Sequence, residues 1–142
     1  MDDELPKILM AFDFGMKRIG VAIGQTITKT ARPLSTLHAK DGIPNWSEVK
    51  ALLAKWKPQA LVVGIPVNMD GSDQKISTNA REFGHSLHAQ FQLPVYEMDE
   101  RLTTKDARER LFESGGYKAL QDGQVDRVAA QLILQNWFAE NI

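Results

Sequence analysis

The sequence has no cysteine among its 142 residues. This absence excludes disulfide bonds and thiolate ligands for zinc. The chain also lacks any apolar run near the roughly 20 residues that cross a membrane, so we expect no membrane contact. Its first residues, MDDELPK, are acidic and have no hydrophobic region of a secretory signal. By elimination, we expect a cytoplasmic protein.

An excess of one charge is lacking as well. The 17 lysines and arginines nearly balance the 18 acidic residues, which leaves a formal net charge of −1. A protein that coats nucleic acid by bulk electrostatics is usually far more basic. The balance counts against such a coat protein, but it is compatible with an enzyme that grips its substrate locally and through metal ions.

The composition that is present, 43% hydrophobic and 25% charged, is typical of a soluble globular protein. The length suits one domain spanning residues 1–142. The unbroken apolar run ILMAF, at 8–12, predicts a central strand covered on both faces. A turn at 15–18 leads into IGVAIG, at 19–24, so these two strands form a hairpin. Further strands are expected at 33–38, 60–65 and, more exposed, 94–99.

Helical spacing of apolar residues predicts a helix at 46–56, capped by Asn45 or Ser47 and stopped by Pro58. Other helices are expected at 76–91, from Thr103 or Thr104 to near Gly115, and at 125–138. Right-handed crossovers place the fourth and fifth strands parallel to the first. The sequence therefore predicts an α/β fold with a mixed five-stranded sheet flanked by helices, which is the RNase H-like topology.

Acidic residues follow two of the predicted strands. Asp13 comes directly after the first strand, and Asp99 and Glu100 come at the end of the fifth. Ligands of open α/β sheets bind at these carboxyl ends. If the fourth strand lies between them, the two ends are about 9–10 Å apart. Catalytic metal pairs are about 3.5–4 Å apart, so Asp13 and Glu100 leave room for one or two ions.

Asp126 is the third candidate acid. In the last helix it shares a face with Ala129 and Ile133, at the edge of the stripe that faces the core. A carboxylate there is costly unless it is partnered, and a metal ion would satisfy it. Three hard oxygen ligands favour Mg²⁺ or Mn²⁺ over zinc. His85 and His88 are three residues apart on a helix, but no further soft ligand accompanies them, which disfavours a zinc site.

Each acid also has a simpler explanation. Asp13 could close the hairpin turn. Glu100 could be a surface acid paired with Arg101, and Asp126 could cap the last helix. The convergence of the three acids at one edge of the sheet favours a metal site.

Four segments occur in an order and at spacings that resemble the YqgF family. They are DFGMKRIGVAIG (13–24), GIPVNMDG (64–71), DERLTT (99–104) and VDRVAAQLIL (125–134). Members of this family are described as nucleases of pre-16S rRNA and as Holliday junction resolvases. The resemblance covers essentially the whole chain, and it departs from the family at Met16, where many members have a small polar residue.

The resemblance implies a RuvC-related, RNase H-like fold and processing of the 5′ end of the 16S rRNA precursor, with ribosomal precursor particles as partners. It implies that Asp13, Glu100 and Asp126 form the catalytic, metal-binding site. From related folds we expect hydrolysis that leaves 5′-phosphate and 3′-hydroxyl ends.

Several further residues are candidates for substrate binding. Lys17 and Arg18 lie in the turn beside Asp13 and could hold a phosphate, although a solvated turn explains them equally well. The loop at 66–71 borders the same edge of the sheet and is expected to shape the substrate groove. The complete set of candidates is Lys17, Arg18, Asn68, Arg101, Thr103 and Thr104.

Three other functions stay open at this point. The Asp13-Phe14-Gly15 turn resembles the phosphate-binding turn of the actin, Hsp70 and sugar-kinase superfamily, but those proteins use two such domains and this chain has the length of one. A non-catalytic RNA-binding assembly factor is the second alternative. A Holliday junction resolvase acting on branched DNA is the third, and it requires a dimer. We favour pre-rRNA as the substrate.

Overall fold

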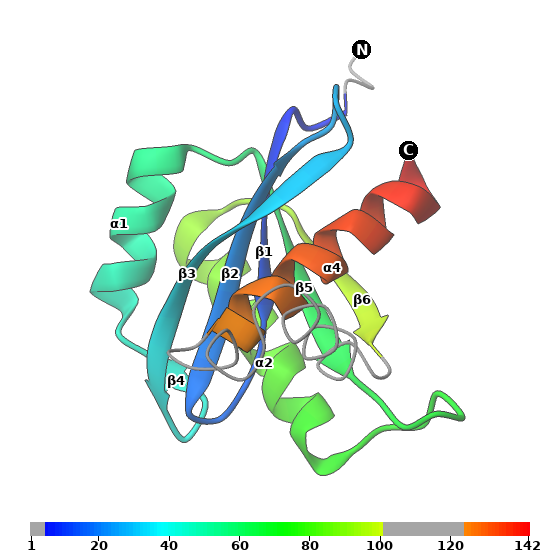
Figure 1. Cartoon of the computed structure of the whole chain (residues 1–142). Coiled ribbons are helices and arrows are strands. Elements are labelled where there is room, and N and C mark those ends of the chain that lie inside the picture. The colour runs from blue at the N-terminus through cyan, green and yellow to red at the C-terminus, as the bar shows by residue number, and fades with distance from the viewer. Residues whose placement is uncertain (1–4, 101–123) are drawn as a thin grey trace.

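The computed structural model describes residues 5–100 and 124–142. They form one twisted sheet with helices on both of its faces (Figure 1). The strand order is β4-β3-β2-β1-β5-β6. The elements are β1 (Ile8–Asp13), β2 (Arg18–Gln25), β3 (Thr30–Lys40), β4 (Ile43–Pro44), α1 (Trp46–Trp56), β5 (Ala60–Pro66), α2 (Lys75–Phe91), β6 (Val95–Glu100) and α4 (Gln124–Asn141).

The strand pairing follows the predicted arrangement. β1 pairs antiparallel with β2 and parallel with β5, and β5 pairs parallel with β6. The predicted fourth strand therefore lies between the first and the fifth, as expected. β6 is a partly exposed edge strand, as its sequence indicated. This order brings the carboxyl ends of β1, β5 and β6 to the same edge of the sheet.

The expected number of five strands was wrong, because the described residues form a sheet of six. β3 continues to Lys40, and β4 then pairs back on it across a two-residue turn. Asp41 and Gly42 form this turn with φ angles of 52° and 80°. Two consecutive positive φ values are the requirement of a type I′ hairpin, for which Asp-Gly is a preferred sequence. The Asp-Gly pair at 41–42 is a sequence signal for this hairpin turn. The strand after it was missed because β4 is only two residues long.

Alternation along the strands divides the core into two layers. Met10 and Phe12 of β1 face α1 and α2, whereas Leu9 and Ala11 face α4. All four side chains are fully buried. β1 is therefore covered on both faces, which explains its unbroken apolar sequence.

The helices begin and end close to their predicted limits. α1 has the predicted bounds, and the Asn45 side chain caps it by accepting a hydrogen bond of 2.9 Å from the Ser47 N–H. α2 begins one residue earlier than predicted, and α4 continues to Asn141. The helix expected from Thr103 or Thr104 lies outside the described residues. Within the described residues, no helix is long and apolar enough to span a membrane.

The packing of α4 on the sheet gives a test of the fold. Ile133 is fully buried between α4 and the sheet. We expect Ile133→Ala to lower the free energy of unfolding by about 2–5 kcal/mol, because it removes buried methyl groups and leaves a cavity. Urea denaturation measures this change. The matched control is Glu140→Ala on the exposed side of the same helix, which should change stability by less than about 0.5 kcal/mol. Equal effects of the two substitutions would contradict the described packing.

Candidate active site at the carboxyl end of the sheet

Asp13 is the last residue of β1, and its side chain lies on the α4 face of the sheet. Alternation fixes this direction, because Leu9 and Ala11 have the same parity and pack against α4. The residues beside Asp13 in the sheet are both glycines, Gly20 in β2 and Gly64 in β5. The neighbouring strands therefore place no side chain against the Asp13 carboxyl group.

Gly20 allows α4 to touch the sheet with its backbone. A Cβ atom at Gly20 would lie 1.9 Å from the carbonyl oxygen of Asp126, a distance that no real Cβ contact shows. Asp126 is in the first turn of α4 and inside the helix, so the explanation that it is the N-cap was wrong. The close approach at Gly20 places Asp126 beside Asp13.

Gly64 makes room for Glu100 in the same way. A Cβ atom at Gly64 would lie 3.1 Å from Cγ of Glu100 and 2.4 Å from Cδ1 of Ile133. The Glu100 side chain therefore extends over Gly64, which is the residue beside Asp13. Its Oε1 atom is buried. Glu100 is thus no simple surface acid, and the three predicted acids come to the same face of the same edge of the sheet.

The acids at this edge of the sheet are close enough to affect each other's ionisation. Burial, and next the negative charge of Asp126, raise the pKa of Asp13 from 3.8 to about 7. Asp126 itself accepts a hydrogen bond of 3.1 Å from Nε of Arg18, which forms an ion pair with it. One of the acids therefore retains a proton near neutral pH, and another is neutralised by an arginine.

A metal ion fits the chemistry of these side chains. Asp13, Glu100 and Asp126 offer the hard carboxylate oxygens that Mg²⁺ and Mn²⁺ prefer. Within residues 5–100 and 124–142, however, no three Asp, Glu, His or Cys side chains are already grouped to hold an ion. The ion pair between Arg18 and Asp126 accounts for part of this, because it directs the Asp126 carboxylate toward the arginine.

The predicted substrate-binding residues have different surroundings. Lys17 is exposed in the turn after Asp13. Arg18 contacts Asp126, and its side chain is 56% exposed. Asn68 is occupied within its own loop, where its amide donates to Ser72 Oγ and to the Asp73 carbonyl. The remaining three candidates, Arg101, Thr103 and Thr104, lie outside the described residues.

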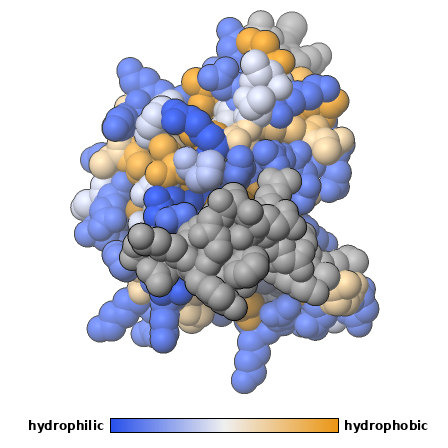
Figure 2. Space-filling view, in the orientation of Figure 1, coloured by the Kyte–Doolittle hydropathy of each residue, from blue (hydrophilic) through white to orange (hydrophobic). Residues whose placement is uncertain are grey.

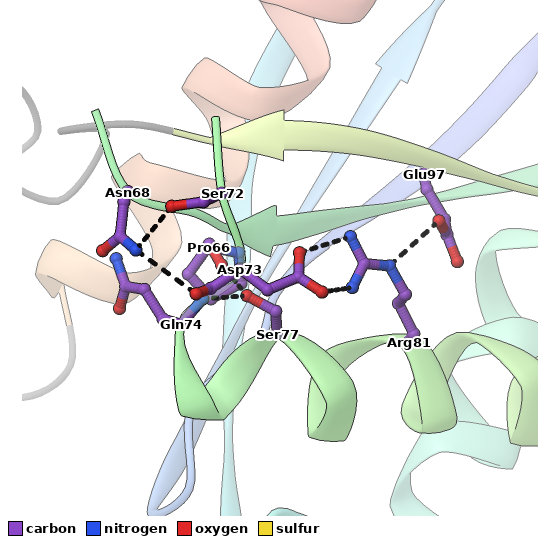
Figure 3. A network of polar contacts seen from close by, with 8 residues as sticks. All are labelled: Pro66, Asn68, Ser72, Asp73, Gln74, Ser77, Arg81 and Glu97. Atoms are coloured by element: carbon purple, nitrogen blue, oxygen red, sulfur yellow. Dashed lines mark hydrogen bonds and ion pairs between the residues drawn. The ribbon is translucent and has the colours of Figure 1, made fainter. Parts of the chain in front are cut away.

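The loop between β5 and α2 is held by a network that the sequence did not reveal (Figure 3). Arg81 of α2 donates two hydrogen bonds to the Asp73 carboxylate, at 2.7 and 3.0 Å, and lies 3.7 Å from Glu97 of β6. Arg81 lowers the pKa of Asp73. The buried hydroxyl of Ser77 donates to the Pro66 carbonyl, which fixes the end of β5. The network positions this loop beside the carboxyl end of the sheet.

The sequence profile of the RuvX family, described as Holliday junction resolvase, matches residues 7–140. The chain belongs to this family. This membership confirms the resemblance found in the four sequence segments. A relative from Aeromonas salmonicida named "Putative pre-16S rRNA nuclease" is 58% identical over 132 residues, which cover 93% of this chain and 94% of the relative. A relative of the same name from Shewanella oneidensis is 53% identical with the same coverage.

Solved structures of resolvases share the fold of this RuvX-family chain. Thermus thermophilus RuvC bound to a Holliday junction substrate superposes with a TM-score of 0.55 at 17% identity, and the match covers 94% of both chains. The fowlpox virus resolvase bound to Holliday junction DNA has a TM-score of 0.54 at 13% identity, covering 94% of this chain and 97% of the other. These likenesses confirm the RuvC-related, RNase H-like fold.

The raised pKa of Asp13 predicts how stability depends on pH. The native state keeps this proton up to about pH 7, whereas the unfolded chain releases it near pH 3.8. Between these values the native state binds more protons, so stability falls as the pH rises. Over this pH range the free energy of unfolding falls by up to roughly 4 kcal/mol. We expect Asp13→Asn, which cannot ionise, to be more stable than the wild type in EDTA, and by more at pH 8 than at pH 5.

Urea denaturation of both proteins at the two pH values measures the difference. A difference that stays constant between pH 5 and pH 8 would mean that Asp13 has an ordinary pKa, and the electrostatic description of the site would be wrong.

The loop network gives a separate prediction. Arg81→Met removes both ion pairs of the network, so we expect faster amide hydrogen exchange at 67–73. The increase should be modest, roughly two- to fivefold, because exposed ion pairs contribute little. Hydrogen exchange followed by mass spectrometry measures it, with Lys75→Met at the start of α2 as the control. Unchanged exchange in the Arg81 variant would show that the loop is held without the network.

Proposed function

We propose that this protein is a divalent-metal-dependent endonuclease that hydrolyses phosphodiester bonds, with Asp13, Glu100 and Asp126 as its acidic site. The observation that carries this proposal is the accumulation of negative charge at one edge of the sheet. Asp13 holds a proton near pH 7 because of its burial and of Asp126, and Asp126 is paired with Arg18. A divalent cation would replace both the proton and the arginine as the source of positive charge.

The proposed cofactor is Mg²⁺ or Mn²⁺, as one or two ions. When bound, such ions promote attack by water and neutralise charge on the leaving oxygen. The protein contributes the carboxylates, and Asp13 releases its proton as the cation binds. The two glycines beside Asp13 have no side chains, which allows α4 with Asp126 and the Glu100 side chain to come close to Asp13.

Arg18 has two roles in this proposal. In the described structure it neutralises Asp126. Once a cation takes over that task, the guanidinium group is released beside the acids, where it can bind a phosphate oxygen of the substrate. Lys17 is exposed in the adjoining turn and adds a second positive charge. This exchange would couple metal binding to substrate binding.

The proposed substrate is the 5′ region of pre-16S rRNA, and ribosomal precursor particles are the proposed partners. Relatives that are 53–58% identical carry a name that refers to this RNA. Resolution of Holliday junctions is the second candidate, because the family description names it. The two reactions differ in what they require. A resolvase cuts two strands symmetrically and needs two sites, whereas trimming an RNA end needs one.

Cleavage assays on both substrates test the proposal. We expect Mg²⁺- or Mn²⁺-dependent cleavage of a pre-16S rRNA fragment, with a rate lowered roughly a thousandfold or more by Asp13→Asn, Glu100→Gln or Asp126→Asn. The matched control is Asp99→Asn. Asp99 precedes Glu100 in β6 but, by alternation, lies on the opposite face of the sheet, so this variant should keep its activity.

A measurement of metal binding separates the roles of the acids from the choice of substrate. Mn²⁺ should raise the melting temperature of the wild type and of Asp99→Asn, but not that of Asp13→Asn. A folded Asp13→Asn protein with full activity would remove Asp13 from the mechanism. A wild type that cleaves neither structured RNA nor branched DNA would favour the non-catalytic RNA-binding factor. Preferred cleavage of a four-way DNA junction by a dimer would favour the resolvase.

A further inference from the structure

A cavity lies at the other end of β1 from Asp13. It has a volume of about 420 Å³ and is lined by Ile8, Ile23, Gly24, Gln25, Thr30, Ala31, Arg32 and Trp56. Ile8 and Ile23 belong to the core layer on the side of α1 and α2, so the cavity is on the face opposite to α4. Five positions of β1 separate Ile8 from Asp13, which is roughly 16 Å. The cavity is therefore distinct from the candidate active site.

Basic residues line this cavity or adjoin its lining residues in the chain. Arg32 lines it, and its guanidinium carbon lies 5.0 Å from the centre of the Trp56 ring. Each of four exposed lysines is the immediate chain neighbour of a lining residue. We call these five residues the basic rim: Lys7, Lys29, Arg32, Lys55 and Lys57. Within the described residues, none of the five forms an ion pair. One lining residue and four chain neighbours of lining residues are thus basic, and none of the five is paired with an acid of the described residues.

The dipole of helix α1 explains the positions of only two members of the basic rim. Lys55 and Lys57 lie at the C-terminal end of α1, where cations are favourable for the helix dipole. The other three members come from the segment before β1, from the β2–β3 turn and from β3. Their positions in or next to the lining of one cavity have no such local explanation.

Two members of the rim occupy backbone positions that disfavour a lysine. Lys29 and Lys57 have φ angles of 54° and 49°. This left-handed conformation favours glycine or asparagine over a residue with a long side chain. Glycine at either position would therefore relieve the backbone while it removes a positive charge.

We propose that the basic rim and its cavity form a second nucleic-acid contact, which binds a single-stranded segment of the substrate away from the cleavage site. The inference rests on the proposed nuclease function. The cations bind backbone phosphates, and the cavity, whose floor includes Ile8 and Ile23, has room for one unstacked base. Trp56 holds the Arg32 guanidinium at the edge of the cavity, where it faces the incoming strand.

The double variant Lys29→Gly/Lys57→Gly separates binding from folding. Glycine suits both backbone positions, so the variant should melt at the same temperature as the wild type or higher. Its affinity for a 20-nucleotide single strand should fall by roughly fivefold or more at 0.1 M salt. The slope of log affinity against log salt should become smaller by about 1.4, because each phosphate contact on a single strand contributes about 0.7.

Binding is measured in EDTA by fluorescence anisotropy, so cleavage does not enter the result. Gln92→Gly, with a φ of 55°, makes the same backbone change without removing a charge. Lys50→Gln removes an exposed lysine elsewhere on α1 and is compared with Lys57→Gly. Both controls should bind like the wild type. If the glycine variant folds poorly, Lys29→Asn/Lys57→Asn gives a second neutral pair that tolerates positive φ.

RNA and DNA strands of the same sequence are both used as probes. Equal losses assign the contact to the phosphate backbone that they share, and a loss on RNA alone assigns it to an RNA strand. An unchanged affinity and salt slope in the double variant overturn the proposal, as does a wild type that binds neither probe or an equal loss in the controls. Because the assay contains no metal, a failure of cleavage and a failure of this contact are told apart.

Discussion

Helix α4 contacts the sheet through backbone, and the candidate site depends on that contact. Gly20 and Gly64 flank Asp13 in neighbouring strands, and a Cβ atom at either would collide with α4. With glycine at both positions, the helix lies low enough to bring Asp126 beside Asp13, while Glu100 extends over Gly64. Interiors are packed so closely that an ångström of displacement at such a contact requires rearrangement of the layer. The same contact therefore determines both the packing of α4 and the position of the acids.

The geometry that collects the acids also destabilises the protein when Asp13 loses its proton. A carboxyl group whose pKa is displaced to about 7 is favourable for folding only while it keeps its proton. Functional sites commonly have this conflict between stability and activity. Here the conflict is partly relieved by Arg18, which neutralises Asp126. Arg18, which the sequence placed in a turn, therefore also affects the charge of the candidate site.

Local sequence signals predicted most of the fold, because they report on local physics. The ILMAF run indicated a buried strand, Asn45 indicated the start of α1, and both were confirmed. Contacts between distant segments could not be predicted in this way. The bond from Arg18 to Asp126 joins residues 108 positions apart, and its existence depends on how α4 crosses the sheet. The sequence made Asn68 a candidate for substrate binding, but it could not show that the Asn68 amide donates hydrogen bonds within its own loop. The basic rim was also hidden, since its members are scattered from Lys7 to Lys57 in a chain with nearly balanced charge.

The exterior of the sheet also has a consequence for association. On the face seen in Figure 2, hydrophobic residues of the described part form small separate groups among hydrophilic ones. At one border of the sheet, β4 is two residues long and ends in Pro44, which has no N–H to offer. β4 therefore offers few backbone groups to a strand from another molecule, and natural sheets use such short, proline-bearing borders to avoid aggregation. Among the described strands, residues 30–38 of β3 pair with β2 alone, so β3 also keeps a border without a partner strand. At the opposite border, the acidic residues Glu97 and Asp99 of β6 would disfavour pairing with the same strand of a second copy.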